Sequence, residues 1–122
     1  MSATVRYIVK DVGSAVEFYV SALGFELVER FGDVMAILRL DALELWVAGP
    51  GASASRPMPN GRTPAPGGWN RIAVIVEDLD AAVSRLKELE TPFRNEPVSG
   101  PGGRQVLIDD PSGNPIELFE PR

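Results

Sequence analysis

The stretch VRYIVKDV at residues 5–12 is repeated, with the same pattern, as IAVIVEDL at residues 72–79. Each copy begins with β-branched and apolar residues typical of a strand and reaches an aspartate, Asp11 or Asp78, that can cap a helix. Apolar residues then recur at helical spacing, as Val12, Val16, Tyr19 and Leu23 in the first copy and Leu79, Val83, Leu86 and Leu89 in the second. The chain therefore contains an internal duplication of a strand and an amphipathic helix.

The ends of the two copies also correspond. Residues 43–47 (LELWV) resemble residues 116–120 (IELFE), and both are typical of strands. A turn at residues 110–114 (DPSGN) leads into the second of these strands. Between the helix and this last strand, each copy has two further extended stretches, at residues 25–30 and 34–40 and at residues 93–98 and 104–109.

This element order predicts an α+β fold of two tandem βαβββ modules within a single domain covering residues 1–122. The modules span about residues 1–49 and 69–122, and residues 50–68 join them. This joining segment is rich in Pro, Gly, Ala and Ser, so we expect neither regular helix nor strand in it. The simpler interpretation is a linker, and the alternative is a loop that also covers a ligand cavity.

The composition excludes several classes of protein. The 122 residues are 44% hydrophobic and 24% charged, an ordinary balance for a globular domain. The net charge is −5 and no run of basic residues compensates for it, which argues against nucleic-acid binding. The sequence shows neither a signal-peptide pattern nor an apolar run long enough to cross a membrane. We therefore expect a cytoplasmic protein without a membrane partner.

The chain has no histidine and no cysteine. Histidine is the commonest metal-binding side chain and the usual general base near neutral pH. Its absence excludes Ser-His-Asp chemistry and the usual metal sites made of histidine and carboxylate. Any catalysis must use carboxylates, lysine, arginine, tyrosine or bound water.

Two motifs resemble signatures of the glyoxalase/bleomycin-resistance/dioxygenase superfamily, also called the vicinal oxygen chelate superfamily. These are FYVSALGF at residues 18–25 and DPSGNPIEL at residues 110–118. The resemblance covers essentially the whole chain. It implies that each module curls its sheet into half of a cup, giving a cupped mixed sheet with the helices outside and a small-molecule ligand inside, and it implies a homodimer. It does not imply one activity, because one fold hosts many functions.

The alternation of side chains along the strands indicates which residues would line such a cup. Successive side chains of a strand point to opposite faces, and one face must pack on a helix. If Leu43, Leu45 and Val47 face the helix, Glu44 and Trp46 face the cup. We apply the same argument to both modules and add the residues just before the second module. The predicted ligand-binding residues are then Thr4, Arg6, Glu44, Trp46, Trp69, Arg71, Glu117 and Phe119.

The resemblance also implies where a metal would bind in the superfamily members that use one. Those members place a ligand on the first strand of each module and a glutamate on the last strand. The corresponding positions here are Thr4, Arg71, Glu44 and Glu117. Arg71 has no lone pair to donate, and its fixed charge would lie where the cation should be. We therefore expect no metal and no other cofactor.

The role of Arg71 has two interpretations. It neutralises Glu117, Glu44 or both, because a buried carboxylate needs a partner and arginine is the best bidentate one. Alternatively, Arg71 binds an anionic or carbonyl-bearing ligand together with Asn70. The aromatic side chains have two interpretations as well, since they either stack on a planar ligand or belong to the core.

These considerations favour a metal-independent small-molecule-binding protein of the superfamily, possibly one that sequesters a drug or metabolite. One alternative is a lyase or isomerase with Glu44 or Glu117 as base and Arg71 stabilising an enolate. A metal-dependent glyoxalase-like or dioxygenase-like enzyme is disfavoured by the missing histidines. A non-catalytic regulatory module would require a cup that is empty or filled by side chains.

Overall fold

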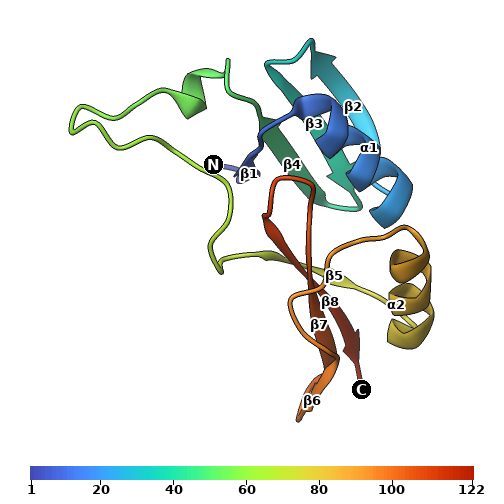
Figure 1. The fold of residues 1–122 in the computed structure, drawn as a ribbon. Coiled ribbons are helices and arrows are strands. Elements are labelled where there is room, and N and C mark those ends of the chain that lie inside the picture. The colour runs from blue at the N-terminus through green and yellow to red at the C-terminus, as the bar shows by residue number, and fades with distance from the viewer. The chain divides into compact units, whose positions relative to one another are not determined.

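The computed structural model describes all 122 residues, which form two compact units, Met1–Pro66 and Gly67–Arg122 (Figure 1). Each unit has one four-stranded mixed sheet and one α-helix. The predicted α+β fold of two βαβββ modules is confirmed. Strands pair only within their own unit, and the shared cup that the resemblance implies stays a prediction.

The first unit contains β1 (Val5–Ile8), α1 (Val12–Leu23), β2 (Glu26–Phe31), β3 (Met35–Leu40) and β4 (Leu43–Ala48). Its strands lie in the order β1-β4-β3-β2. The outer strand β1 runs parallel to β4, and the other neighbours are antiparallel.

The second unit repeats this topology with β5 (Ile72–Ile75), α2 (Leu79–Glu88), β6 (Val98–Gly100), β7 (Gly103–Asp109) and β8 (Pro115–Pro121). Its order is β5-β8-β7-β6, again with one parallel pair, β5 and β8. The same strand order in both units confirms the duplication.

Both helices begin where the sequence predicts. The carboxylate of Asp11 accepts a hydrogen bond from the Ser14 backbone N–H at 2.8 Å, and that of Asp78 accepts one from the Ala81 N–H at 3.0 Å. Each bond satisfies a backbone donor that the first helical turn cannot satisfy itself. The first helix ends at Gly24, whose φ of 78° is the left-handed conformation that glycine adopts without strain.

The core of each unit lies between its helix and one face of its sheet. Tyr19 of α1 is fully buried, and α1 packs on β3 and β4. In the second unit Leu86 is buried on α2, which packs on β8. The buried strand residues facing the helices include Leu38, Leu45, Val47, Val106, Ile108, Ile116 and Leu118. The opposite face of each sheet therefore carries side chains that are half-buried or exposed, among them the apolar Ile75.

The prediction of an extended strand at residues 93–98 is wrong. Only Phe93 makes an isolated bridge, to Ile108, and β6 begins at Val98. A side chain replaces the missing strand partner here, because Asn95 Oδ1 accepts the Leu107 backbone N–H at 2.9 Å. Pro97, which has no N–H to donate, also interrupts any ladder.

The segment expected to join the modules has little regular structure. Its one helical element is a 3₁₀ turn at Ser53–Ser55, and a tight turn follows where Met58 N–H bonds to the Arg62 carbonyl at 2.7 Å. Residues up to Pro66 belong to the first compact unit, and Gly67 begins the second. No helix in the chain has the length and apolar character needed to span a membrane.

Candidate functional site

Each sheet has an open face, opposite its helix, and most of the predicted ligand-binding residues lie there. Strand register places Arg6 beside Trp46 and Arg39 beside Glu44 in the first unit. In the second unit it places Ile75 beside Phe119. We call these surfaces the open faces. They include Arg6, Ile37, Arg39, Glu44 and Trp46 in the first unit and Ala73, Ile75, Gln105, Leu107, Glu117 and Phe119 in the second, where Arg71, directly before β5, bonds to Glu117.

On the open face of the first unit, Glu44 is held by two donors. The Trp46 indole Nε1 donates to Oε1 of Glu44 at 2.8 Å, and Arg39 Nη2 lies 3.4 Å from Oε2. The Arg6 guanidinium covers the Trp46 ring, 5.0 Å from its centroid, in a cation–π contact. Our sequence reasoning missed Arg39. Arg39 could have been found from the sequence, because it lies directly opposite Glu44 in the β3–β4 hairpin.

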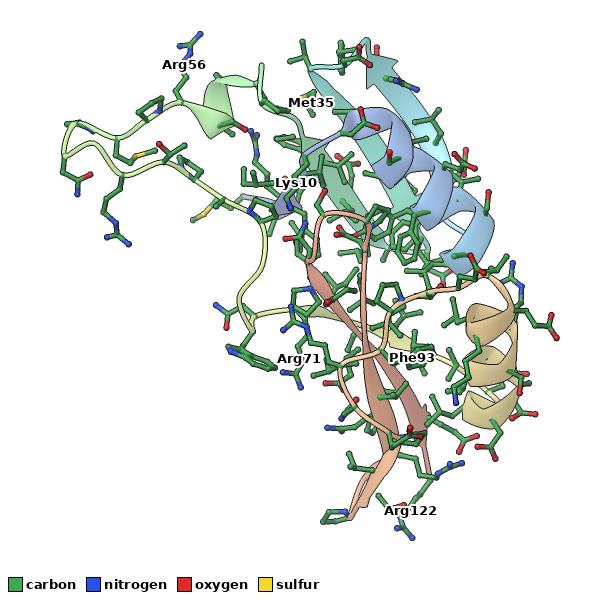
Figure 2. The ribbon with its side chains drawn as sticks, viewed as in Figure 1. Lys10, Met35, Arg56, Arg71, Phe93 and Arg122 are labelled. Atoms are coloured by element: carbon green, nitrogen blue, oxygen red, sulfur yellow. The ribbon has the colours of Figure 1, made fainter.

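On the open face of the second unit, Arg71 is the partner of Glu117. Its Nη2 and Nε atoms donate to the same oxygen, Oε1, at 2.8 and 3.1 Å. The remaining Nη1 donates to the backbone carbonyl of Trp69 at 3.3 Å. Figure 2 shows Arg71, the residue directly before β5. The sequence left Glu117 and Glu44 as possible partners of Arg71. The structure pairs Arg71 with Glu117, whereas Glu44 is paired with Arg39.

The other predicted residues differ in their surroundings. Thr4 precedes β1 and is exposed, and the structure brings it into no side-chain hydrogen bond. Phe119 is half-buried between Ile75 and Gln105 on the neighbouring strands. The Trp69 side chain is 68% exposed, which excludes a core role for this residue.

An open pocket of about 530 Å³ lies beside Trp69 in the second unit. Gly68, Trp69, Arg94 and Asp109 line it. Arg94 and Asp109 form an ion pair at 2.6 Å, and neither was predicted as a site residue. No local motif marks them, because Arg94 lies in the stretch wrongly expected to be a strand and its partner is fifteen residues away.

The closing motif at residues 110–114 has a structural role. Asp110 is buried and accepts hydrogen bonds from the Ser112 and Asn114 backbone N–H groups at 2.8 and 2.9 Å. Asn114 Oδ1 in turn accepts the Gly67 backbone N–H at 2.8 Å. The motif therefore fixes the turn before β8 and ties the beginning of the second unit, next to Trp69, to that turn.

Comparison with known proteins agrees with this architecture. The family model of the Glyoxalase/Bleomycin resistance protein/Dioxygenase superfamily matches residues 2–118. The chain belongs to this superfamily. A lactoylglutathione lyase of Pseudomonas putida is 29% identical to this chain. The alignment covers 93% of this chain and 80% of the relative.

Two solved structures are similar over nearly their whole length. The lactoylglutathione lyase from Agrobacterium tumefaciens has a TM-score of 0.74 and 25% identity, covering 98% of this chain and 94% of its own. TnmS3, an antibiotic binding protein from Streptomyces sp. CB03234, has a TM-score of 0.71 and 26% identity, covering 100% of this chain and 98% of its own. The chain is thus similar both to an enzyme and to an antibiotic binding protein.

The residues at the superfamily's metal positions do not fit a metal ion. Arg71 cannot be a ligand, and Thr4 offers only a neutral hydroxyl. Glu117 is already paired with Arg71, and Glu44 is held by Trp46 and Arg39. A divalent cation at Glu44 would have to displace these donors, and at either carboxylate it would be repelled by a guanidinium a few ångströms away.

Proposed function

We propose that this chain is a metal-independent small-molecule-binding protein of the superfamily. The observation that carries the proposal is the pairing of each open-face glutamate with an arginine, Glu44 with Arg39 and Glu117 with Arg71. In each pair the carboxylate is neutralised by a permanent cation, so the positions that would hold a metal instead form neutral ion pairs, and Arg6 is a further cation over the Trp46 ring.

Neutral ion pairs beside aromatic rings suit an uncharged or weakly polar organic ligand. Small-molecule sites are mostly apolar and aromatic, with a few placed polar groups that orient the ligand. Trp46 and Trp69 supply aromatic surface, and the guanidinium groups supply hydrogen-bond donors. Similarity to the antibiotic binding protein TnmS3 supports this proposal. Sequestration of a drug or metabolite would need only stoichiometric binding of this kind.

Elemental analysis and native mass spectrometry test metal independence. The protein is purified from cells grown with added zinc, nickel and manganese, and it is compared with Glu44→Gln, Glu117→Gln and the exposed helix control Glu17→Gln. We expect no stoichiometric metal in any of the four proteins and ligand binding that is unchanged by a chelator. A stoichiometric metal that disappears only in the Glu44 or Glu117 variant would refute the proposal.

A second candidate is a metal-free lyase or isomerase, favoured by the two similar lactoylglutathione lyases. Both hydrogen bonds from Arg71 to Glu117 end on Oε1, which leaves Oε2 as a proton acceptor, with Arg71 placed to stabilise an enolate. The test is a lactoylglutathione lyase assay in the presence of chelator. Chelator-resistant turnover that Glu117→Gln lowers by about 10²-fold or more would establish this candidate.

We further propose that the protein is a cytoplasmic homodimer. The edge strand β2 supports association because it exposes Leu27, Val28 and Phe31 by 41, 40 and 46%. Sedimentation should give a dimer mass, and Phe31→Lys should shift the equilibrium toward monomer. A monomeric wild-type protein at micromolar concentration would contradict the proposal.

A further inference from the structure

Of the arginines named on the open faces, Arg6 alone has no carboxylate partner. Arg39 and Arg71 each bond to a glutamate. Arg6 instead makes a cation–π contact, with its Cζ atom 5.0 Å from the centroid of the Trp46 ring. The Arg6 side chain is exposed, and its guanidinium forms no hydrogen bond or ion pair within the chain. All five of its N–H groups are therefore available to a ligand.

A chain of contacts holds the Arg6 guanidinium in place. The Trp46 ring beneath it is half-buried, and the indole N–H bonds to Oε1 of Glu44 at 2.8 Å. The other oxygen of Glu44, Oε2, faces Arg39 Nη2 at 3.4 Å. Both oxygens of this glutamate thus already have a donor, so it does not compete with a ligand for Arg6. Binding to a group whose support is already ordered loses little conformational entropy.

Apolar side chains lie beside Arg6 on the same open face. Ile8 lies two positions further along β1 and therefore points to the same side. Strand register places Ile8 beside Ala48 and Ala48 beside Met35, the first residue of β3, which Figure 2 labels. We call Ile8, Ala48 and Met35 the apolar stripe. From the spacing of strands and residues in a sheet, the Cα atoms of Arg6 and Met35 are about 12 Å apart.

The charges of this open face differ between its two edges. Glu26 and Glu29 of β2 lie opposite Arg39 and Ile37, so they point to the same face as Arg6. The strands β1 and β2 are the two outer strands of the sheet and are about 14 Å apart, which exceeds the screening length of about 8 Å at physiological ionic strength. These acids therefore leave the charge of Arg6 unneutralised, and they repel an anion from the β2 edge. An anionic group is favoured at Arg6 only.

We propose that the open face of the first unit binds an elongated apolar molecule that carries one carboxylate. The carboxylate bonds to Arg6, and the apolar part lies along the apolar stripe toward Met35. A guanidinium fits a carboxylate in both geometry and charge, and it can form these bonds while it covers an aromatic ring. The inference rests on the proposed small-molecule-binding function and adds one charged group to an otherwise uncharged ligand.

Four probes test the ligand class. They are decanoate, decan-1-ol, which has no charge, decyltrimethylammonium, which has the opposite charge, and butyrate, which has the carboxylate without the long chain. The Trp69→Phe variant keeps Trp46 as its one tryptophan, so its ¹H–¹⁵N spectrum has a single indole N–H signal. We expect decanoate to shift this signal in a saturable way. Decan-1-ol and butyrate should each bind about tenfold more weakly or worse, and decyltrimethylammonium most weakly.

Variants separate the contribution of Arg6 from that of the apolar stripe. Arg6→Gln should weaken decanoate binding about tenfold and leave decan-1-ol binding unchanged. The matched control Arg56→Gln removes the same charge from an exposed arginine on the joining segment and should change neither affinity. Met35→Ala should weaken decanoate about fivefold without affecting butyrate. Urea unfolding of each variant verifies that it remains folded.

Several results would overturn the inference. These are equal affinities for decanoate and decan-1-ol, unchanged decanoate binding in Arg6→Gln, equal losses in Arg6→Gln and Arg56→Gln, or no movement of the Trp46 signal. A stronger response to decyltrimethylammonium would also overturn it, because the acids of β2 would then select the ligand. The proposed function itself fails on a different measurement, the finding of a stoichiometric metal held by Glu44 or Glu117.

Discussion

Arg71 directs two of its nitrogens, Nη2 at 2.8 Å and Nε at 3.1 Å, to one carboxylate oxygen of Glu117, a residue 46 positions further along the chain. The side chains are 29 and 15% exposed, so the pair is neither a surface contact nor fully removed from water. It occupies the open face of the second unit and sets the charge of that face to zero.

Arg71→Met should destabilise the protein by about 1–2 kcal/mol, because Glu117 would keep a largely buried charge without its partner. This is less than the cost of breaking a fully buried pair, since water still reaches both side chains. The measurement is urea unfolding. Adding Glu117→Gln to Arg71→Met should recover part of the loss, whereas Arg30→Met, which breaks the exposed pair with Asp33, should cost less than about 0.5 kcal/mol. Equal losses for Arg71→Met and Arg30→Met would contradict this account.

Replacement of Glu44 should depend on whether the new side chain can accept the Trp46 N–H. Glu44→Gln keeps an acceptor oxygen, and Glu44→Leu leaves the half-buried indole donor without its 2.8 Å partner. We expect Glu44→Leu to be about 1 kcal/mol less stable than Glu44→Gln. The same two changes made in Trp46→Phe, which has no N–H, provide the control. A difference that persists in that background would show that the indole bond is not its cause.

Gly103→Ala should be strongly destabilising. Gly103 has a φ of 153°, and a Cβ at this position would overlap the backbone carbonyl oxygen of Glu120 on the paired strand β8. Backbone atoms within a ladder cannot move aside cheaply, so we expect a loss of about 3 kcal/mol or more. Gly100→Ala is the matched control, because nothing lies within 4 Å of its Cβ position. Similar thermal midpoints for the two variants would contradict the prediction.

The ion pair between Asp80 and Arg104, 3.0 Å apart, predicts a pH dependence. The hydrogen bond and charge of Arg104 hold the pKa of Asp80 below its usual value. The pair therefore stabilises the folded protein above the unfolded-state pKa of about 3.9, and this contribution is lost as the pH falls through the lower folded-state pKa.

The melting temperature of Asp80→Asn, measured from pH 7 to pH 2.5, tests this dependence. The variant should melt below the wild type at pH 7, and the difference should shrink below about pH 4. High salt should reduce the difference as well, because both side chains are on the surface. A difference that grows on acidification would have the wrong sign and would exclude this pair as its cause.

Local patterns in the sequence were enough to predict the elements that depend on periodicity. The aspartates before each helix, the helical spacing of apolar residues and the alternation in LELWV and IELFE all depend on residues within one element. They correctly predicted the caps, the two modules and the strand faces of Glu44, Trp46, Glu117 and Phe119. At residues 93–98 the same reasoning failed, because Asn95 satisfies the neighbouring strand with its side chain.

Contacts between distant residues, in contrast, depend on how the strands and loops pack together. The sequence and the family resemblance left two roles open for Arg71, neutralising Glu117, Glu44 or both, or binding a ligand. The choice depends on how β5 lies against β8, and Arg39 reaches Glu44 through the register of a hairpin. The Trp69 pocket depends still more on tertiary structure, because Arg94 gathers Gly68, Asp109 and Gly113 from three separate segments. Hydrogen bonds of this kind form between groups that are distant in sequence, so no spacing within the chain encodes them.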